Sequence, residues 1–252
     1  MAGHSKWANI KHRKAAQDKK RAKVWTRIIK EITIAARDGG PDPDSNPALR
    51  LAVQNGKGAN LPKDTIERAI KKGSGAEAAN LQSYTYEGYG PHGIAIFIHA
   101  TSDNINRTVA NVRSIFTKNN GTLGTNGSLS FLFETKGVFA IENESIDNWD
   151  RDDLELALID GGADEVEFDD TGLTIYTSFD DYGDMQSKLH ELNITATATE
   201  IHQIPTSTKK LALSEAEEVL KIIDKFEEDD DVQTVFHNLE LTDELIAQLE
   251  NS

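Results

Sequence analysis

Cysteine is absent from the 252 residues of this sequence. Disulfide frameworks, thiolate zinc sites, iron–sulfur clusters and cysteine nucleophiles are therefore excluded, and we expect a protein of a reducing compartment. Long apolar runs are also missing, since the longest unbroken one is Ile94–Ile98. That run is far too short to cross a bilayer, and no secretory hydrophobic segment follows the first residues. We expect a soluble protein with no membrane partner.

Aromatic residues are scarce, at 7% of the chain, and hydrophobic residues make up 38%. The chain can bury a core, but this composition does not favour one large core. A length of 252 residues fits one large domain or two to three small ones.

Basic residues are fewer than acidic ones, 27 against 42, so the formal net charge is −15. Its distribution is uneven. Residues 1–75 hold 17 Lys and Arg against 7 Asp and Glu, a net charge of +10, which leaves −25 for residues 76–252. Between Lys6 and Lys30 there are ten basic residues and one acid. Such a segment matches a partner with dense phosphate.

The basic segment is predicted to be mostly helical. Residues 1–10 lack a clear period and are expected to form an arm. A helix is predicted over about 13–37, because its apolar residues between Trp25 and Ala36 recur at helical spacing. The opposite side of this helix is predicted to present a row of cations, namely Lys20, Lys23, Arg27 and Lys30.

The rest of the chain mixes helices and strands. Further helices are predicted over 47–54, 62–72, 104–119, 152–160, 182–192, 215–226 and 242–249. Strands are predicted over 84–86, 94–99, 128–133, 138–141, 165–168, 173–177, 194–201 and 232–237. The chain therefore belongs to the α+β class if these patterns hold.

The order of these elements indicates three domains and a tail. Residues 137–205 are complete as a ferredoxin-like, split β–α–β domain, whereas residues 81–136 have only half of one. Residues 206–241 supply a missing helix and strand, so the third domain is predicted to be inserted into the second. The predicted parts are a basic helical domain (1–80), an α/β domain (81–136 with 206–241), an acidic inserted α/β domain (137–205) and a tail (242–252).

No catalytic or metal-binding pattern stands out. The seven histidines show no i,i+4 pair and no metal-ligand spacing. Gly56-Lys57-Gly58 lacks the remaining residues of a phosphate-binding loop, and the glycines at 121, 124 and 127 follow a helix rather than a strand. The 42 carboxylates cluster as solvated acidic faces do. We expect no enzyme, no cofactor, no metal and no small-molecule substrate; an unrecognised hydrolase is the alternative.

The basic N-terminus has three possible interpretations: a solvated face, a mitochondrial presequence or a nucleic-acid-binding surface. Ten cations against one acid exceed what solubility needs. Presequences favour Arg and Ser, whereas residues 1–37 hold 7 Lys, 4 Arg and only Ser5. We therefore favour nucleic-acid binding. Trp7 is either a stacking platform for a base or an anchor for the arm.

Several motifs resemble the YebC-type family across essentially the whole chain. They are Gly3-His4-Ser5-Lys6-Trp7, Ile10-Lys11-His12-Arg13-Lys14, Asn46-Pro47 with Leu49-Arg50, the run from Leu61 to Ile70, the run from Tyr86 to Pro91, and Asp103-Asn104 with Asn106-Arg107-Thr108. Two departures are His99, where a carboxylate is expected, and Asn119-Asn120, where glycine is commoner.

The resemblance implies a three-domain fold and a regulator of gene expression in the bacterial cytoplasm. Members are labelled transcriptional regulatory proteins, a mitochondrial branch activates translation of cytochrome oxidase, and both promoter DNA and the ribosome have been described as targets. The expected partner is DNA, ribosomal RNA or both, and the oligomeric state stays open. An alternative is a protein-interaction scaffold that uses the acidic domains. The candidate nucleic-acid-binding residues are Lys6, Trp7, Lys11, His12, Arg13, Lys14, Lys19, Lys20, Lys23, Arg27 and Lys30.

Overall fold

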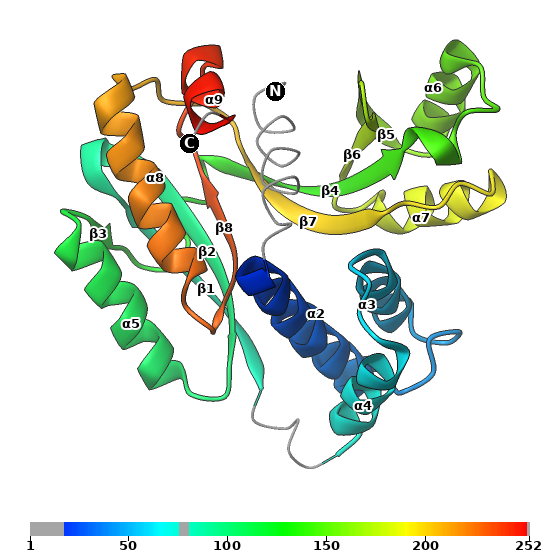
Figure 1. Ribbon diagram of the computed structural model, residues 1–252, viewed down its shortest axis with the longest axis horizontal. Helices are drawn as coiled ribbons and strands as arrows, with labels where there is room; N and C mark the ends of the chain where they lie inside the picture. The colour runs from blue at the N-terminus through cyan, green and yellow to red at the C-terminus, as the bar shows by residue number, and fades with distance from the viewer. Residues whose placement is uncertain (1–17, 76–80, 251–252) are drawn as a thin grey trace. The chain divides into compact units, whose positions relative to one another are not determined.

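The computed structural model describes residues 18–75 and 81–250, with side chains for 22–75 and 81–247 (Figure 1). Contacts divide the chain into two compact units. One consists of residues 1–133 and 205–252, and the other of residues 134–204. Helices and two antiparallel sheets make up the described residues, which confirms the predicted α+β class.

Among the described residues, the N-terminal part of the first unit contains the helices α2 (Asp18–Gly39), α3 (Pro47–Gly58) and α4 (Lys63–Gly73). Asn46 fixes the corner between the first two. Its Oδ1 accepts from the Leu49 amide at 3.0 Å, and its Nδ2 donates to the Ala35 carbonyl at 2.7 Å. A capping asparagine followed by proline thus starts α3 and ties it to the end of α2.

The core between these helices is small and aliphatic. Its buried residues are Ile28, Ile32, Ala35, Ala36, Leu49, Ala52, Leu61, Ile66 and Ala69. The helices approach closely at Gly73, where an added Cβ would lie 2.5 Å from the Thr33 carbonyl oxygen. Trp25 packs on this core and donates its Nε1–H to the Ala59 carbonyl at 3.0 Å.

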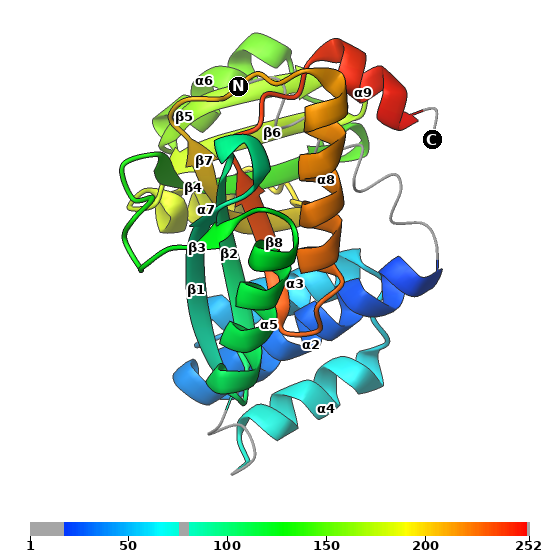
Figure 2. The same ribbon diagram turned by 90° about the vertical axis from the view of Figure 1, so that its left-hand side faces the viewer.

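The sheet of the first unit has the strand order β3-β1-β2-β8. Its strands are β1 (Gln82–Tyr89), β2 (Ala95–Ser102), β3 (Thr122–Leu123) and β8 (Val232–His237). Helices α5 (Ile105–Lys118) and α8 (Leu213–Glu227) cover one face (Figure 2). The chain closes with α9 (Asp243–Glu250). Since β2 and β3 both pair antiparallel with the strand between them, β2–α5–β3 is a split β–α–β unit.

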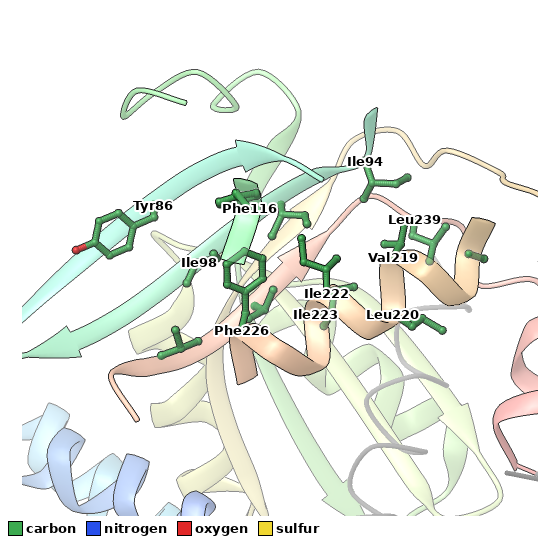
Figure 3. Packing of buried hydrophobic residues seen from close by; sticks show 14 of the residues in the cluster. Tyr86, Ile94, Ile98, Phe116, Val219, Leu220, Ile222, Ile223, Phe226 and Leu239 are labelled. Atoms are coloured by element: carbon green, nitrogen blue, oxygen red, sulfur yellow. The ribbon is translucent and has the colours of Figure 1, made fainter. Parts of the chain in front are cut away.

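The largest core of the molecule lies between this sheet and its two helices (Figure 3). Phe116 of α5 and Phe226 of α8 meet at its centre with ring centroids 4.7 Å apart. Alternate residues of β2, such as Ile96 and Ile98, point into the same cluster. Segments more than 100 residues apart in the chain thus share one core.

The second unit has the strand order β5-β6-β4-β7. Its elements are β4 (Phe133–Glu142), α6 (Arg151–Asp160), β5 (Ala163–Asp169), β6 (Gly172–Ser178), α7 (Tyr182–Glu191) and β7 (Ala198–Pro205). This chain order and strand order are those of a ferredoxin-like domain. The first sheet starts with a hairpin instead, so the two α/β parts share a split β–α–β unit but differ in connection.

Two predicted strands are wrong in position. Residues 126–132 form turns instead. Two of their amides, those of Gly127 and Leu129, donate to the two carboxylate oxygens of Glu87, both at 2.6 Å. The strand predicted over 194–201 begins at Ala198. The apolar residues of this segment indicated burial correctly, but Ile194 packs into the core of the second unit before the hydrogen bonding of β7 begins.

Candidate nucleic-acid interface

The structure describes only part of the predicted binding set. Six of its residues lie outside the described residues, namely Lys6, Trp7, Lys11, His12, Arg13 and Lys14. Lys19 and Lys20 lie on α2, but their side chains are not among those described. The remaining three, Lys23, Arg27 and Lys30, have side chains in the described part.

These three cations lie on one side of α2, spaced by four and three residues, so they follow one another along the helix. All three point at residues 229–233, which comprise the end of the α8–β8 connection and the start of β8 in the same unit. Lys23 Nζ donates to the Asp229 carbonyl at 3.0 Å, and Arg27 Nη1 donates to the Gln233 carbonyl at 3.4 Å. Burial lowers the pKa of Lys23, although the acids at 227–230 act in the opposite direction.

Lys30 contacts three oxygen atoms of the first α/β part. Its ammonium donates to the Asp230 carbonyl at 2.6 Å and to the Thr101 carbonyl at 3.0 Å. It also lies 3.4 Å from Asp231 Oδ1. An ammonium has three protons to donate, so these three oxygens fill its capacity.

The expectation of an outward-facing row of cations is therefore corrected for these three residues. The helical wheel of α2 shows one apolar face, which packs on the small helical core. The structure gives it a second, polar partner, the α8–β8 connection of the first α/β part. A sequence wheel shows that a face is charged but not whether the chain itself supplies the counter-charge.

Asp231 is the centre of this contact and is only 5% exposed. Its carboxylate accepts from Ser102 Oγ at 3.0 Å and from Thr108 Oγ1 at 2.9 Å. Arg107 reaches it with Nη2 at 2.8 Å and Nε at 3.1 Å, a two-pronged pair. Together with Lys30, these donors join α2, β2, α5 and the start of β8 at one carboxylate.

The environment keeps this carboxylate ionised. Burial alone would raise the pKa of Asp231. The hydrogen bonds from its three neighbours and the charge of Lys30 outweigh burial, so the pKa lies below its usual value.

Sequence reasoning missed this cluster, although both halves were visible. The motif that contains Arg107 carries part of the family resemblance, and Asp231 is one of the carboxylates expected to lie on solvated acidic faces. The ion pair between Arg107 and Asp231 spans 124 residues, so no local spacing reveals it. The local signal is Asn104, whose side chain caps α5 by accepting from the Arg107 backbone amide and so fixes where the helix begins.

No group of three His, Asp or Glu side chains in the described part of the chain is arranged to hold a metal ion. Among the helices of those residues, none has the length and apolar character that a bilayer crossing requires.

The fold defines an α+β protein of two compact units, in which the described chain begins with a helical region joined to the first α/β part by cations and a carboxylate. Two family models match the chain, the TACO1/YebC protein N-terminal domain over residues 5–76 and the TACO1/YebC second and third domain over residues 81–239. The chain belongs to the TACO1/YebC family.

Relatives support the same assignment. A protein of Amoebophilus asiaticus named "Probable transcriptional regulatory protein" is 48% identical over 241 residues, covering 95% of this chain and 98% of the relative. One of Klebsiella pneumoniae with the same description is 47% identical over 250 residues, covering 99% and 100%. A crystal structure of a conserved hypothetical protein from Aquifex aeolicus, Aq1575, matches with a TM-score of 0.79 at 37% identity, covering 90% of this chain and 93% of that one.

Proposed function

We propose that this chain is a non-enzymatic regulator of gene expression that binds nucleic acid through its basic N-terminal segment. The charge distribution carries the proposal: ten basic residues and one acid lie between Lys6 and Lys30 in a chain with a net charge of −15. Relatives named as transcriptional regulatory proteins support the regulatory role. The proposal needs no cofactor, and it places the protein in the cytoplasm.

The cations divide into two groups in this proposal. Lys23, Arg27 and Lys30 position α2 against the first α/β part, as their hydrogen bonds support. Phosphate binding is assigned to the cations that precede them, with His12 and Trp7 beside them. The binding cations are Lys6, Lys11, Arg13, Lys14, Lys19 and Lys20.

Binding of this kind is mainly electrostatic. Each lysine or arginine that meets a phosphate releases condensed counterions, so affinity falls steeply with salt and depends little on sequence. Residues 76–252 carry a net charge of −25 and repel the same polyanion. This repulsion orients the protein with its basic end toward the nucleic acid.

RNA fits this proposal better than a specific DNA site. Reading duplex DNA calls for side chains on an element that enters the major groove, usually from a dimer. The sequence has no helix-turn-helix pattern and no dimer zipper. A ribosomal target needs charge, shape and some stacking, for which Trp7 is available. Crosslinking in growing cells followed by sequencing of the attached nucleic acid separates the two: ribosomal RNA reads support this assignment, and promoter DNA reads overturn it.

The binding segment itself is tested by replacing Lys11, Arg13 and Lys14 with alanine. We expect retention on RNA, DNA and ribosomes at low salt to fall by more than about tenfold, because three phosphate contacts are lost. The matched control replaces Lys57, Lys71 and Lys72 with alanine. These substitutions remove the same charge, but from exposed positions of α3 and α4. An equal loss in both variants would show that net charge alone governs retention, and no loss in either would refute nucleic-acid binding by this segment.

A further inference from the structure

The second compact unit carries a helix face that nothing in the described part of the unit covers. Helix α6 buries Leu154 and Leu158 against its sheet, as an ordinary packed helix does. Two more apolar residues, Leu156 and Ile159, lie on its outer side and are 63% and 52% exposed. Since they are three residues apart, their side chains are neighbours on the helix surface.

Carboxylates surround this apolar pair. Asp152 and Asp160 lie one turn to either side of Leu156, and Glu155 lies one turn before Ile159. None of the three has an ion pair with a lysine or arginine among the described residues. Arg151, the cation at the start of α6, stacks on an aromatic ring: its guanidinium carbon lies 4.1 Å from the centre of the Phe168 ring.

The charge of the whole unit selects the kind of partner. Residues 134–204 hold 19 Asp and Glu against 3 Lys and Arg, a net charge of −16. Nucleic acids and anionic lipid surfaces are repelled by such a unit. A cationic protein segment is attracted, and an apolar stripe along it would cover Leu156 and Ile159.

We propose that the outer face of α6, formed by Leu156 and Ile159 within their carboxylates, docks a basic amphipathic helix of a partner protein. This surface is distinct from the nucleic-acid-binding segment and does not depend on it. The apolar pair supplies affinity, and the carboxylates supply orientation and exclude acidic segments. With one helix face involved, the contact belongs to the weak, transient class of interfaces.

The test titrates the full chain with a synthetic helical peptide that has leucine at positions i, i+3, i+4 and i+7 and lysine elsewhere. Isothermal calorimetry gives the affinity, and one comparison peptide replaces each leucine with serine while another replaces each lysine with glutamate. The variant is Leu156→Gln with Ile159→Gln, which changes exposed residues only. We expect about tenfold weaker binding of the leucine–lysine peptide to it. Phe179→Gln is the matched control, being 55% exposed in the same unit, and its affinity should match that of the unaltered chain.

Three results would overturn the proposal. One is equal binding by the α6 variant and the unaltered chain, with unchanged thermal unfolding showing that both are folded. Another is tight binding of the serine peptide, which would reduce the contact to bulk charge. The last is binding of an RNA oligonucleotide, or of a peptide copying residues 4–21 of this chain, with the same dependence on Leu156 and Ile159.

Discussion

Asp231 joins α2, β2 and α5 through a single carboxylate, so its loss affects the packing of all three elements. Replacing it with asparagine removes the charge that Arg107 and Lys30 share and leaves their donors partly unpaired. We expect Asp231→Asn to lower the free energy of unfolding by about 1.5–3 kcal/mol, the range for hydrogen bonds to a charged group.

Urea unfolding of both proteins measures the difference. Asp230→Asn is the matched control, because Asp230 is exposed and meets Lys30 through its backbone carbonyl only. A loss in Asp231→Asn no larger than in this control would contradict the assigned role.

The lowered pKa of Asp231 also predicts a pH dependence. Its folded-state pKa lies below its unfolded-state value of about 3.9, so the stabilisation is fully present above that value. It is lost as the pH falls through the folded-state pKa. Unfolding free energies of the unaltered chain and Asp231→Asn, measured between pH 6 and pH 3, should therefore converge toward the acid end. A constant difference across that range would show that the carboxylate is not held ionised by its neighbours.

At the scale of elements, the packing of α2 on α4 depends on Gly73. A methyl group there would collide with the Thr33 carbonyl oxygen and with the Ala36 side chain. We expect Gly73→Ala to cost about 1–3 kcal/mol of stability, as overpacked sites do. Gly183→Ala in α7 is the control, because nothing lies near its Cβ position and alanine favours helix. Thermal unfolding of the two variants and the unaltered chain measures these effects. If Gly73→Ala left the unfolding temperature unchanged, α2 and α4 would be able to move apart without cost.

Much of the element pattern could be predicted from local sequence. Helix α5 runs over Ile105–Lys118 where 104–119 is expected, since its cap and its apolar spacing are both local signals. In place of the strand expected over 128–133, the chain forms turns up to residue 132, and Glu87, about 40 residues earlier, accepts hydrogen bonds from the Gly127 and Leu129 amides. The spacing of apolar residues indicates which side chains are buried. It does not reveal a side chain from a distant segment that competes for backbone hydrogen bonds.

The sequence alone predicts part of the candidate site, namely its cations, but not the groups that they contact. A cluster of cations is plain in the composition of residues 1–75. That Lys23, Arg27 and Lys30 face the chain's own carbonyls and Asp231 follows only from the tertiary contact with a segment some 200 residues later. Counter-charge supplied from such a distance leaves no trace in a helical wheel.

At the scale of the whole molecule, the chain separates charge of opposite sign along its length. The N-terminal 75 residues carry +10 and the remainder −25. We expect the affinity for RNA to depend on the first group and the affinity for cationic peptides on the acidic unit of residues 134–204. Since the two surfaces are distinct, Leu156→Gln with Ile159→Gln should leave RNA binding unchanged. A parallel loss of RNA binding in that variant would show that the two activities share one surface.

The salt dependence of RNA binding tests the central claim most directly. With about six phosphate contacts, a plot of log Kobs against log salt should have a slope of about −4 to −5 for the unaltered chain. The slope should become shallower by 2 to 3 units when Lys11, Arg13 and Lys14 are replaced, and it should stay the same when Lys57, Lys71 and Lys72 are replaced. A slope near zero, or the same slope in the first variant as in the unaltered chain, would contradict the account.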